Sequence, residues 1–443
     1  MLLGAHSGWN LSPKATGDPT GRRVCSADRN SVYNLAVDSS RRAELPRSGP
    51  LADLRVLDCS TMLAGPLACQ MLGDYGADVI KIEHPGRGDS LRGHGRSRHG
   101  HGLWWKMVSR NKRCIGLYLG DPEAAAVFEK LVATADVVVE NFRPGTFERW
   151  GLGWDRLSEV NPRLVLCRVT GFGQDGPYAS RPAFGTLIEA MSGFAHMTGE
   201  PDGPPTLPPF GLADSVAGLA AAAAVLMALR HRDAAGEGQV IDLSILEPMA
   251  AALGPHILNY DQFHQEAARH GNRSLNNAPR NTYLTADGSW VAVSASADPV
   301  AARALALVGR PDIATEPWFA TGAGRAAHSE EIDALMSAWI GERTLAEVTA
   351  AFEAADVAIA PVYGVAEYVA DPQVVHRGAV VAVPDEDLGP LRMQDVPFRL
   401  SETPGEVRHT GRPLGADTDA ILGGELDIAP GVIAALRDRR VLA

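Results

Sequence analysis

One carboxylate stands apart in this sequence because of its position. Asp214 follows a proline-rich segment, 204–211, and opens an alanine-rich apolar stretch that runs to Leu229. Proline restricts the backbone φ angle and glycine frees it, so a segment that ends in Gly211 sets the angle at which the chain enters a helix. An aspartate there caps exposed N–H groups, favoured as an anion by the helix dipole, or acts as a carboxylate nucleophile. Taken alone, the segment favours the cap, which is the commoner role.

The surrounding sequence predicts the elements that must hold this carboxylate. Short apolar strands alternate with glycine turns and helices, and a strand, helix and strand within about 30 residues form a parallel βαβ unit. We therefore predict a doubly wound, Rossmann-like α/β domain, whose ligands bind beyond the carboxyl ends of the strands. The expected strands are at 54–58, 77–83, 135–140, 164–169 and 239–244.

The residue composition and the hydrophobic pattern change along the chain, and these changes predict several structural units. The first 50 residues lack hydrophobic periodicity and predict a disordered or loosely attached extension. Within 282–294 the Asp287-Gly288 turn between two β-rich runs predicts a hairpin and a smaller α+β domain. The predicted units are 1–50 (extension), 51–250 (large α/β domain), 251–271 (linker), 272–358 (small α+β domain) and 359–443 (linker and C-terminal return to the large domain).

Composition excludes several classes of partner. The net charge of -12 argues against nucleic acid or an anionic membrane as the main partner. Five scattered cysteines without metal-ligand spacing, and no secretory apolar segment near the start, favour a reducing cytoplasm. The apolar run at 212–229 is mostly alanine and reads as a buried helix, not a membrane span. For His94, His99 and His101 a mobile polar loop is favoured over a metal site, which stays open as an alternative.

Several ordered segments resemble the class III CoA-transferase family, of the formyl-CoA and carnitine CoA-transferase type, which also contains α-methylacyl-CoA racemases. The resemblance runs from residue 51 to near the C-terminus, and the ordered set is specific although each segment alone is weak. It implies an interlocked homodimer, CoA or acyl-CoA as substrate, and no metal or tightly bound cofactor. Among the matching segments are 54–66, 72–83, 136–145, 171–177 and 211–214.

The family's acyl-carrying aspartate falls on Asp214. The resemblance implies that this carboxylate attacks an acyl-CoA thioester to form a mixed anhydride, which CoA converts to an aspartyl-CoA thioester. An acceptor carboxylate and then CoA complete the transfer from an acyl-CoA to a carboxylic acid. A carboxylate nucleophile suits this chemistry because both intermediates are activated acyl groups. With the surrounding segments considered, nucleophile becomes the favoured role, with the cap holding the group ionised and aimed outward.

The resemblance also carries over CoA-contacting positions, one by one. Asn141 and Phe142 match the nucleotide-side loop, Arg149 a phosphate-binding arginine and Leu117 an adenine contact. His84 stands where some members carry a phosphate-binding arginine. By residue type alone, these positions favour structural roles: a loop asparagine, core Phe and Leu, and a solvated arginine.

Departures from the family pattern bear on the ligand. Gly120 replaces a lysine of some members, so Arg87, Arg92 or Arg113 is expected to compensate at the phosphates. Leu63 replaces a glutamine and Gly185 a carboxylate of the formyl-CoA type, which argues against oxalate or formate specificity. Leu63 and Met62 indicate a bulkier or less polar acyl group. Glu189 is expected at a surface or polar helix position, with an active-site acid as the alternative.

Two other functions compete with transfer. A 2-methylacyl-CoA racemase needs an acid and a base on opposite faces of the α-carbon, and the racemase branch places a histidine where 181–187 has none. His196 lies beyond that segment and is expected to be structural. A non-catalytic acyl-CoA-binding protein is disfavoured by the intact Asp214 and its Gly211 entry. The sequence therefore favours CoA transfer.

Overall fold

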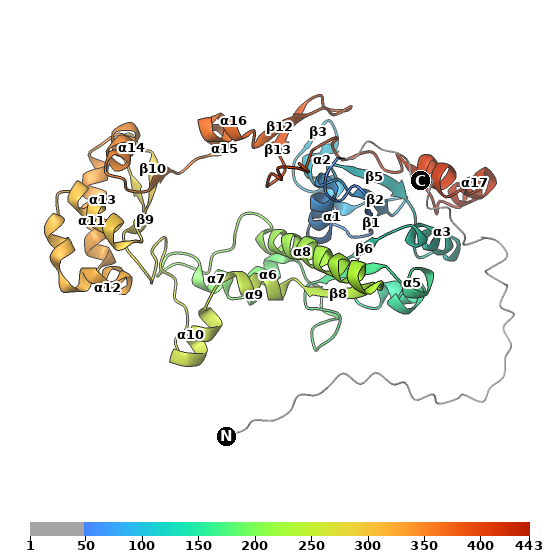
Figure 1. Ribbon diagram of the computed structural model, residues 1–443, viewed down its shortest axis with the longest axis horizontal. Helices are drawn as coiled ribbons and strands as arrows, with labels where there is room; N and C mark the ends of the chain where they lie inside the picture. Colours follow the sequence, from blue (N-terminus) through green and yellow to red (C-terminus); the bar gives the residue numbers. More distant parts are fainter. Residues whose placement is uncertain (1–47) are drawn as a thin grey trace, which may run out of the picture.

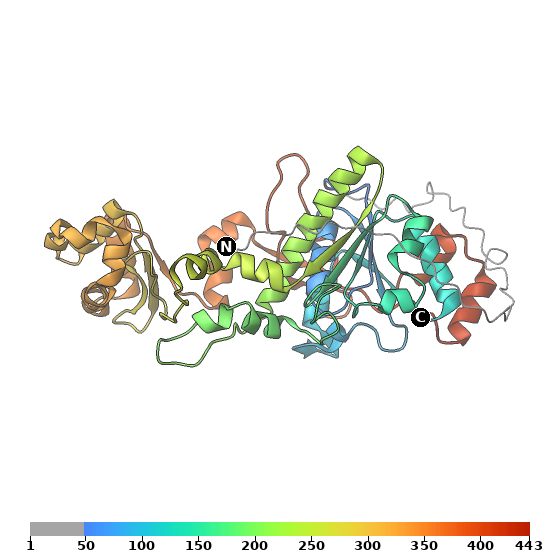
Figure 2. The ribbon, with the colours of Figure 1, turned by 90° about the horizontal axis from the view of Figure 1, so that it is seen from below.

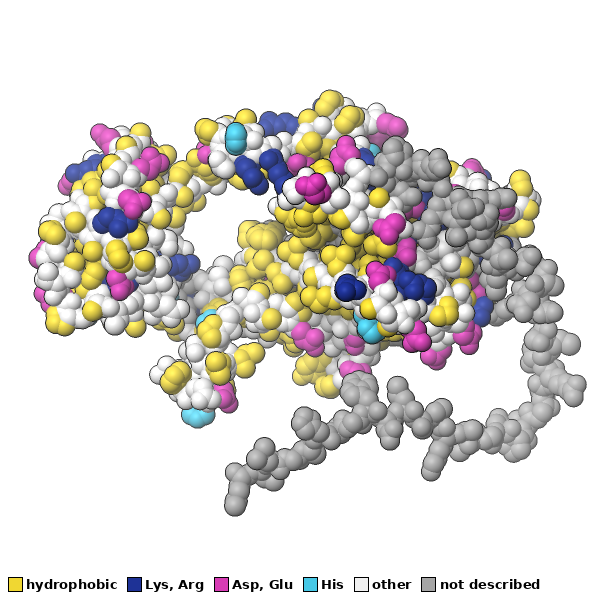
Figure 3. All heavy atoms as spheres, viewed as in Figure 1, with side chains coloured by type: hydrophobic (Ala, Val, Ile, Leu, Met, Phe, Trp, Pro, Cys, Tyr) yellow, Lys and Arg dark blue, Asp and Glu magenta, His cyan; other side chains and the backbone are white. Residues whose placement is uncertain are grey.

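A computed structural model describes residues 48–443, so the predicted extension at 1–50 lies almost wholly outside the described residues. The described chain forms two globular parts joined by long connections (Figure 1). Between the parts the space-filling view shows an opening through the molecule (Figure 3). Viewed from below, the small part lies at one end and the C-terminal helices lie at the other (Figure 2).

Six parallel strands form the central sheet of the large part, in the order β5-β2-β1-β6-β7-β8. The doubly wound class is confirmed. Residues alternate between the faces: Val56 and Val137 face one core, while Leu57 and Val138 face the other. Burial on both faces explains why the strands read as continuous apolar runs. The strands are β1 (Arg55–Asp58), β2 (Asp78–Glu83), β5 (Lys112–Gly116), β6 (Val137–Glu140), β7 (Val165–Thr170) and β8 (Gln239–Ser244).

Helices cover both faces of this sheet. One core holds α3 (Pro122–Ala133), α4 (Thr146–Arg149), α5 (Trp154–Val160) and the C-terminal helix α17 (Pro430–Asp438). The other core holds α1 (Ala64–Asp74), α6 (Gly185–Met191), α8 (Leu212–Ala235) and α9 (Leu246–Ala252). Elements at the rim are η2 (Ser90–Gly93), β3 (Ser97–Arg98), β4 (His101–Gly102), α2 (Leu103–Val108) and α7 (Phe194–Met197).

Strand β5 was not among the predicted strands. Its residues include Lys112 and Arg113, which are buried in the sheet and paired with carboxylates. A pattern of apolar residues cannot find a strand whose buried positions are charged, because the pairing partners come from distant parts of the chain.

The chain reverses its direction of winding between β1 and β6. From β1 it proceeds outward through β2 to β5, and then returns to β6 and proceeds through β7 to β8 on the other side. The loops after β1 and β6 therefore diverge over opposite faces. A crevice at the carboxyl ends of such neighbouring strands is where doubly wound sheets bind ligands.

Helix α8 lies unusually close to α1. A Cβ atom added at Gly218 would lie 2.9 Å from Leu67 Cβ and 3.1 Å from the Ala64 carbonyl oxygen, so only glycine permits this approach. Within residues 48–443, α8 is the one helix long and apolar enough to cross a bilayer by composition. One face of α8 packs on α1, α6, α9 and the sheet, while Leu219 and Met227 on its other face are exposed, so the predicted buried helix is buried on one side only.

The smaller part has its own sheet and core. Strands β9 (Arg280–Leu284) and β10 (Trp290–Ser294) form the predicted antiparallel hairpin, and β11 (Ile359–Pro361) pairs with β10. Buried side chains pack between this sheet and its helices. The helices of the small domain are α11 (Asp298–Leu307), η3 (Pro311–Thr315), η4 (Pro317–Ala320), α12 (Gly322–Ala327), α13 (Ser329–Gly341) and α14 (Leu345–Ala354).

Two connections join the parts. The first carries α10 (His256–Phe263), and the second carries α15 (Val365–Ala370), α16 (Pro372–Arg377) and the hairpin β12 (Val380–Val383) with β13 (Leu391–Gln394). The chain then returns to the large sheet through the π-helical turn Ala420–Glu425 and α17. Leu442 pairs with Leu117 beyond the end of β5, which attaches the C-terminus to the large domain.

The close approach of α8 to α1 gives a stability prediction. Gly218→Ala gains helix propensity but forces the helices apart, so we expect a net loss of about 1–3 kcal/mol in unfolding free energy. The matched control is Gly431→Ala in α17, where an added Cβ meets nothing within 4 Å. That change should stabilise by up to ~1 kcal/mol. Denaturant unfolding measures both, and equal effects would contradict the packing explanation.

Candidate functional site

Asp214 lies at the third position of α8, after the N-cap Gly211. No side-chain bond caps the helix from Gly211, and Asp214 is not the N-cap, so the predicted capping role is wrong. Gly211 has a φ of −71°, which any residue adopts. Glycine leaves space there, since an added Cβ would lie 3.1 Å from Leu63 Cδ1 and 3.3 Å from Asp214 Oδ2 and would push both side chains aside.

The cap comes instead from another helix. Glu189 Oε1 accepts a hydrogen bond from the Ala213 N–H at 3.0 Å. Glu189 belongs to α6 and is 1% exposed, so its predicted surface position is wrong. A carboxylate at a helix N-terminus satisfies an N–H that the helix leaves unpaired. This bond fixes the backbone next to Asp214 and leaves the Asp214 carboxylate for other chemistry.

The environment of Asp214 makes it more basic than an ordinary aspartate. Burial, followed by the negative charge of Glu189, raises its pKa to about 6. The prediction that cap geometry holds this group ionised is therefore wrong in its cause, because burial and Glu189 favour the protonated form. At neutral pH the carboxylate is still mostly ionised, and its raised pKa makes it a stronger nucleophile than a solvated aspartate.

Glycine at 185 makes room for this carboxylate. A Cβ atom added at Gly185 would lie 2.5 Å from Asp214 Oδ2 and 3.0 Å from its carboxyl carbon. The position where the formyl-CoA type has a carboxylate thus forms one wall of the Asp214 site. Leu63, which is buried, forms another wall from the loop after β1. The site sits at the end of α8 that faces the small domain (Figure 1).

Buried charges hold the loop after β1. Lys81 Nζ lies 2.9 Å from Asp89 Oδ2, and Asp89 Oδ1 accepts from the Met62 N–H at 3.1 Å. Met62 has a φ of 65°, an uncommon conformation for a residue with a side chain. At the base of the loop, burial would raise the pKa of Asp58, but Lys112 and Lys81 hold it below its usual range. These fixed charges orient the loop that ends in Leu63.

Asn141 joins the two loops at the reversal of the sheet. Its Oδ1 accepts from the Thr61 N–H at 2.7 Å, and its Nδ2 donates to the Thr61 carbonyl at 2.7 Å. Phe142 is half-buried and packs edge-on against Trp150, with ring centroids 5.1 Å apart. Arg149 is exposed at the end of α4, and its guanidinium donates a hydrogen bond to Thr146 Oγ1 at 2.8 Å. Asn141, Phe142 and Arg149 thus follow one strand, β6.

Leu117 and His84 follow the neighbouring strands β5 and β2. Leu117 is 1% exposed and its side chain belongs to the core. His84 is half-buried, its ring lies 5.1 Å from that of Tyr118, and its Nδ1 accepts from the Gly86 N–H at 3.1 Å. Burial and the nearby Arg87 lower the pKa of His84. The imidazole is therefore neutral at pH 7 and offers a neutral N–H donor, not a charge.

The arginines expected to compensate at the phosphates are placed differently from one another. Arg113 is buried and pairs with Asp78 and Glu425, so its predicted phosphate role is wrong. Arg92 pairs with Glu83 through two short contacts. Arg87 is exposed in the loop after β2, beside His84. Arg87 is therefore the best placed of the three to meet an anion.

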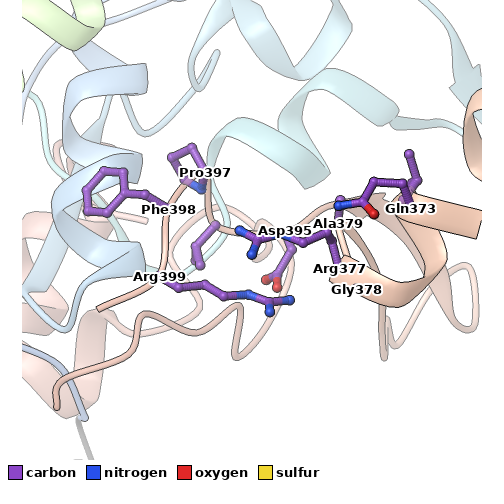
Figure 4. Close-up of a pocket in the computed structure, with 10 residues that line it drawn as sticks. Gln373, Arg377, Gly378, Ala379, Asp395, Pro397, Phe398 and Arg399 are labelled. Atoms are coloured by element: carbon purple, nitrogen blue, oxygen red, sulfur yellow. The ribbon is translucent and has the colours of Figure 1, made fainter. Parts of the chain in front are cut away.

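A separate cavity of about 220 Å³ lies outside this site (Figure 4). It is lined by α16 and by the segment after β13, including Arg377, Asp395 and Arg399. None of the predicted site residues lines it. Within residues 48–443 the structure has no group of three or more His, Cys, Asp or Glu side chains placed to hold a metal. His196 is exposed, with its Nε2 3.7 Å from Glu266 Oε2.

The structure places the positions that the sequence singled out in two separate groups. Asp214, Gly185 and Leu63 share one corner, while Asn141 and His84 lie at the carboxyl edge of the sheet. Sequence reasoning missed the capping role of Glu189 and the loop-holding role of Asp89. The signal for Glu189 was its spacing of four residues from Gly185, which places both on one helix face.

Comparisons with known proteins agree with this geometry. The family model described as CoA-transferase family III matches residues 51–418. The chain is 42% identical, over 89% of its length and 98% of the relative, to succinyl-CoA–D-citramalate CoA-transferase of Chloroflexus aurantiacus. It is 35% identical, over 85% of its length and 96% of the relative, to succinate–glutarate CoA-transferase of Agrobacterium fabrum.

Solved structures show the same fold. A CaiB/BaiF family protein from Brucella suis superposes with a TM-score of 0.75 and 31% identity, covering 85% of this chain and 99% of that one. The protein Rv3272 from Mycobacterium tuberculosis gives a TM-score of 0.74 and 28% identity, covering 84% and 98%.

The Asn141–Thr61 pair gives a prediction for ligand binding. Asn141→Asp keeps the size and one acceptor but replaces the N–H donor by a negative oxygen facing the Thr61 carbonyl. We expect a loss of about 1–3 kcal/mol in unfolding free energy and roughly tenfold weaker CoA binding by calorimetry. The control is Asn272→Asp, whose Nδ2 bonds Thr282 on the exposed surface. CoA affinity equal to the wild type in Asn141→Asp would show that this loop does not shape the CoA site.

Proposed function

This chain belongs to CoA-transferase family III, and on that premise we propose that it transfers CoA between carboxylic acids through covalent intermediates on Asp214. The observation that carries the proposal is the site around Asp214. There a half-buried carboxylate of raised pKa is surrounded by Gly185, Gly211 and Leu63. Family membership makes the chain a CoA-transferase; the route through Asp214 is the part proposed here.

The proposed route has four displacements at acyl carbons. Asp214 Oδ attacks the thioester carbonyl of the donor, the C–S bond breaks, and CoA leaves as a thiolate from the mixed anhydride. The thiolate attacks the Asp214 carbonyl carbon, which releases the donor acid and leaves an aspartyl-CoA thioester. The acceptor carboxylate then displaces CoA to give a second anhydride. Finally the thiolate attacks the acceptor's carbonyl, which forms the new acyl-CoA and regenerates Asp214.

Several features of the site support this route. Asp214 is basic enough to attack and still mostly ionised at neutral pH, because its pKa lies near 6. Burial removes part of its water shell, which strengthens it as a nucleophile. The hydrogen bond from the Ala213 N–H to Glu189 holds the first turn of α8, so the Asp214 carboxylate needs little reorganisation before it attacks. Asn141, Phe142, Arg149 and His84 remain the proposed CoA contacts, whereas Leu117 is 1% exposed and has almost no surface to offer a ligand.

For the substrates we propose succinyl-CoA as donor and a short dicarboxylic acid as acceptor. The support is that relatives 42%, 41% and 35% identical carry succinyl-CoA or succinate in their names, with citramalate, malate or glutarate as the other acid. A succinyl group is bulkier than a formyl group, as expected for a site with Leu63 and Met62. Its free carboxylate makes it polar, which differs from the less polar group also considered from the sequence.

We further propose that two copies of the chain associate. Helix α10 has no buried residue, and its Ile257 and Phe263 side chains are 75% and 67% exposed. Met227 on α8 is 72% exposed, and apolar side chains gather beside the opening (Figure 3). Exposed apolar faces of this kind indicate a protein partner. A second copy passing through the opening, as the family resemblance implies, would cover them.

The proposed nucleophile is tested by Asp214→Ala. We expect transfer to fall at least about 10³-fold, because the variant lacks the acyl-carrying group. CoA binding and unfolding free energy should stay near the wild type. In the wild type, hydroxylamine with succinyl-CoA should convert Asp214 to its hydroxamate, detected by peptide mass spectrometry.

The control for that variant is Asp233→Ala, the same change near the other end of α8, where the side chain is exposed. Its transfer rate should equal that of the wild type. Substantial transfer by Asp214→Ala would contradict the proposed route. Exchange of the α-proton of a 2-methylacyl-CoA with deuterated water, without any acceptor acid, would indicate racemisation instead.

The proposed association is tested by light scattering during size-exclusion chromatography. We expect a species of twice the 47.0 kDa chain mass at micromolar concentration. The double change Ile257→Glu and Phe263→Glu should shift the population toward single chains, since charges oppose burial of α10. A wild-type protein that elutes only as a single chain would contradict the proposal.

A further inference from the structure

We propose that Glu189 is a positioning residue for Asp214: it fixes the first turn of α8 and places a second negative charge beside the attacking carboxylate. The inference rests on the proposed function, because it assigns Glu189 a part in presenting the nucleophile. The proposal stands on how α6 meets α8, on the burial of Glu189, and on the charges around Asp214.

One face of α6 is built around the start of α8. Gly185 and Glu189 are four residues apart on α6, so they lie one above the other on the same face. Gly185 leaves space for Asp214 Oδ2, which would lie 2.5 Å from any Cβ at that position. Glu189 binds the neighbouring Ala213 N–H at 3.0 Å. The same helix face therefore makes room for the carboxylate and fixes its backbone.

The negative charge of Glu189 is not needed for this hydrogen bond. Glu189 is 1% exposed, and it has no ion-pair partner among the side chains of residues 48–443. Burying an unpaired carboxylate costs stability, and a neutral glutamine would offer the same acceptor oxygen to Ala213. A buried carboxylate that carries this cost beside a nucleophile points to a role for its charge.

Glu189 is also the charged neighbour that affects Asp214 most directly. Burial is the larger cause of the raised pKa of Asp214, and the negative charge of Glu189 is the second cause. The walls from the other sides, Leu63, Gly185 and Gly211, are uncharged. Charged groups on the elements packed against α8 are paired with other groups or exposed. Asp74 of α1 pairs with Arg110, and Arg168 of β7 pairs with Glu140 and Glu148. Asp242 of β8 accepts from the Gln174 N–H, and Glu247 of α9 is exposed.

Such a charge assists acylation of Asp214. Two carboxylates close together in a partly dry site repel each other. When Asp214 attacks the thioester, its negative charge passes to the departing CoA thiolate and the repulsion from Glu189 is relieved. The repulsion therefore raises the energy of the free enzyme more than that of the acylated enzyme, which favours the first step.

The test is Glu189→Gln, which keeps the Ala213 bond and removes the charge. In the wild type, kcat/KM with succinyl-CoA should fall as pH drops through about 6, as Asp214 becomes protonated. Removing Glu189's charge lowers the pKa of Asp214, so the acid limb should move to lower pH by at least about half a unit. The plateau kcat should fall several-fold, with the KM for succinyl-CoA changed by less than about twofold, because a less basic carboxylate is a weaker nucleophile.

Two further variants separate charge from structure. Glu247→Gln makes the same change on the adjacent helix α9 and should leave the pH profile at the wild-type position. Glu189→Ala also removes the Ala213 bond and should lower kcat about tenfold below Glu189→Gln. An acid limb for Glu189→Gln that coincides with the wild type overturns the inference. Hydroxamate formation at Asp214 in that same variant would show that the nucleophile proposal stands independently.

Discussion

The position of the reactive carboxylate depends on three close approaches of backbone at the start of α8. Gly218 lets α8 lie on α1, Gly211 lets the turn pass Leu63, and Gly185 lets α6 touch Asp214. A methyl group at any of these places would meet atoms at 2.5–3.1 Å. Because packed interiors transmit such displacements, these close contacts restrain the position of the nucleophile. The alanine-rich composition of α8 serves the same close packing.

Around this constraint, buried charges turn flexible loops into fixed walls. Lys81 and Lys112 converge on Asp58, and Asp89 holds the backbone of Met62. A pair of this kind costs desolvation, so it contributes less to stability than to a unique geometry. The loops at the reversal of the sheet are thereby prepared before a ligand arrives, which reduces the ordering cost of binding.

The sequence predicted the architecture well because apolar periodicity and glycine turns are local signals. The strands at 239–244 and the hairpin near Asp287 lie where expected. What could not be predicted depends on partners far along the chain. Strand β5 was missed because its buried residues include charged ones. Arg113 pairs with Glu425 and does not face a phosphate site. The cap of α8 comes from Glu189, which lies on a different helix. The tendency of an aspartate to cap its own helix predicted the wrong role for Asp214, because Glu189 of α6 accepts from the Ala213 N–H instead.

The central claim is that each transferred acid passes through a covalent bond to Asp214, and oxygen-18 tests it most directly. An acceptor acid labelled in its carboxylate forms the bridging bond of the second anhydride. When CoA attacks the acceptor's carbonyl, that bridging oxygen departs with Asp214. Turnover with labelled acceptor should therefore place oxygen-18 in the side chain of Asp214, read by mass spectrometry of the peptide that contains it. An unlabelled Asp214 after many turnovers would contradict the account.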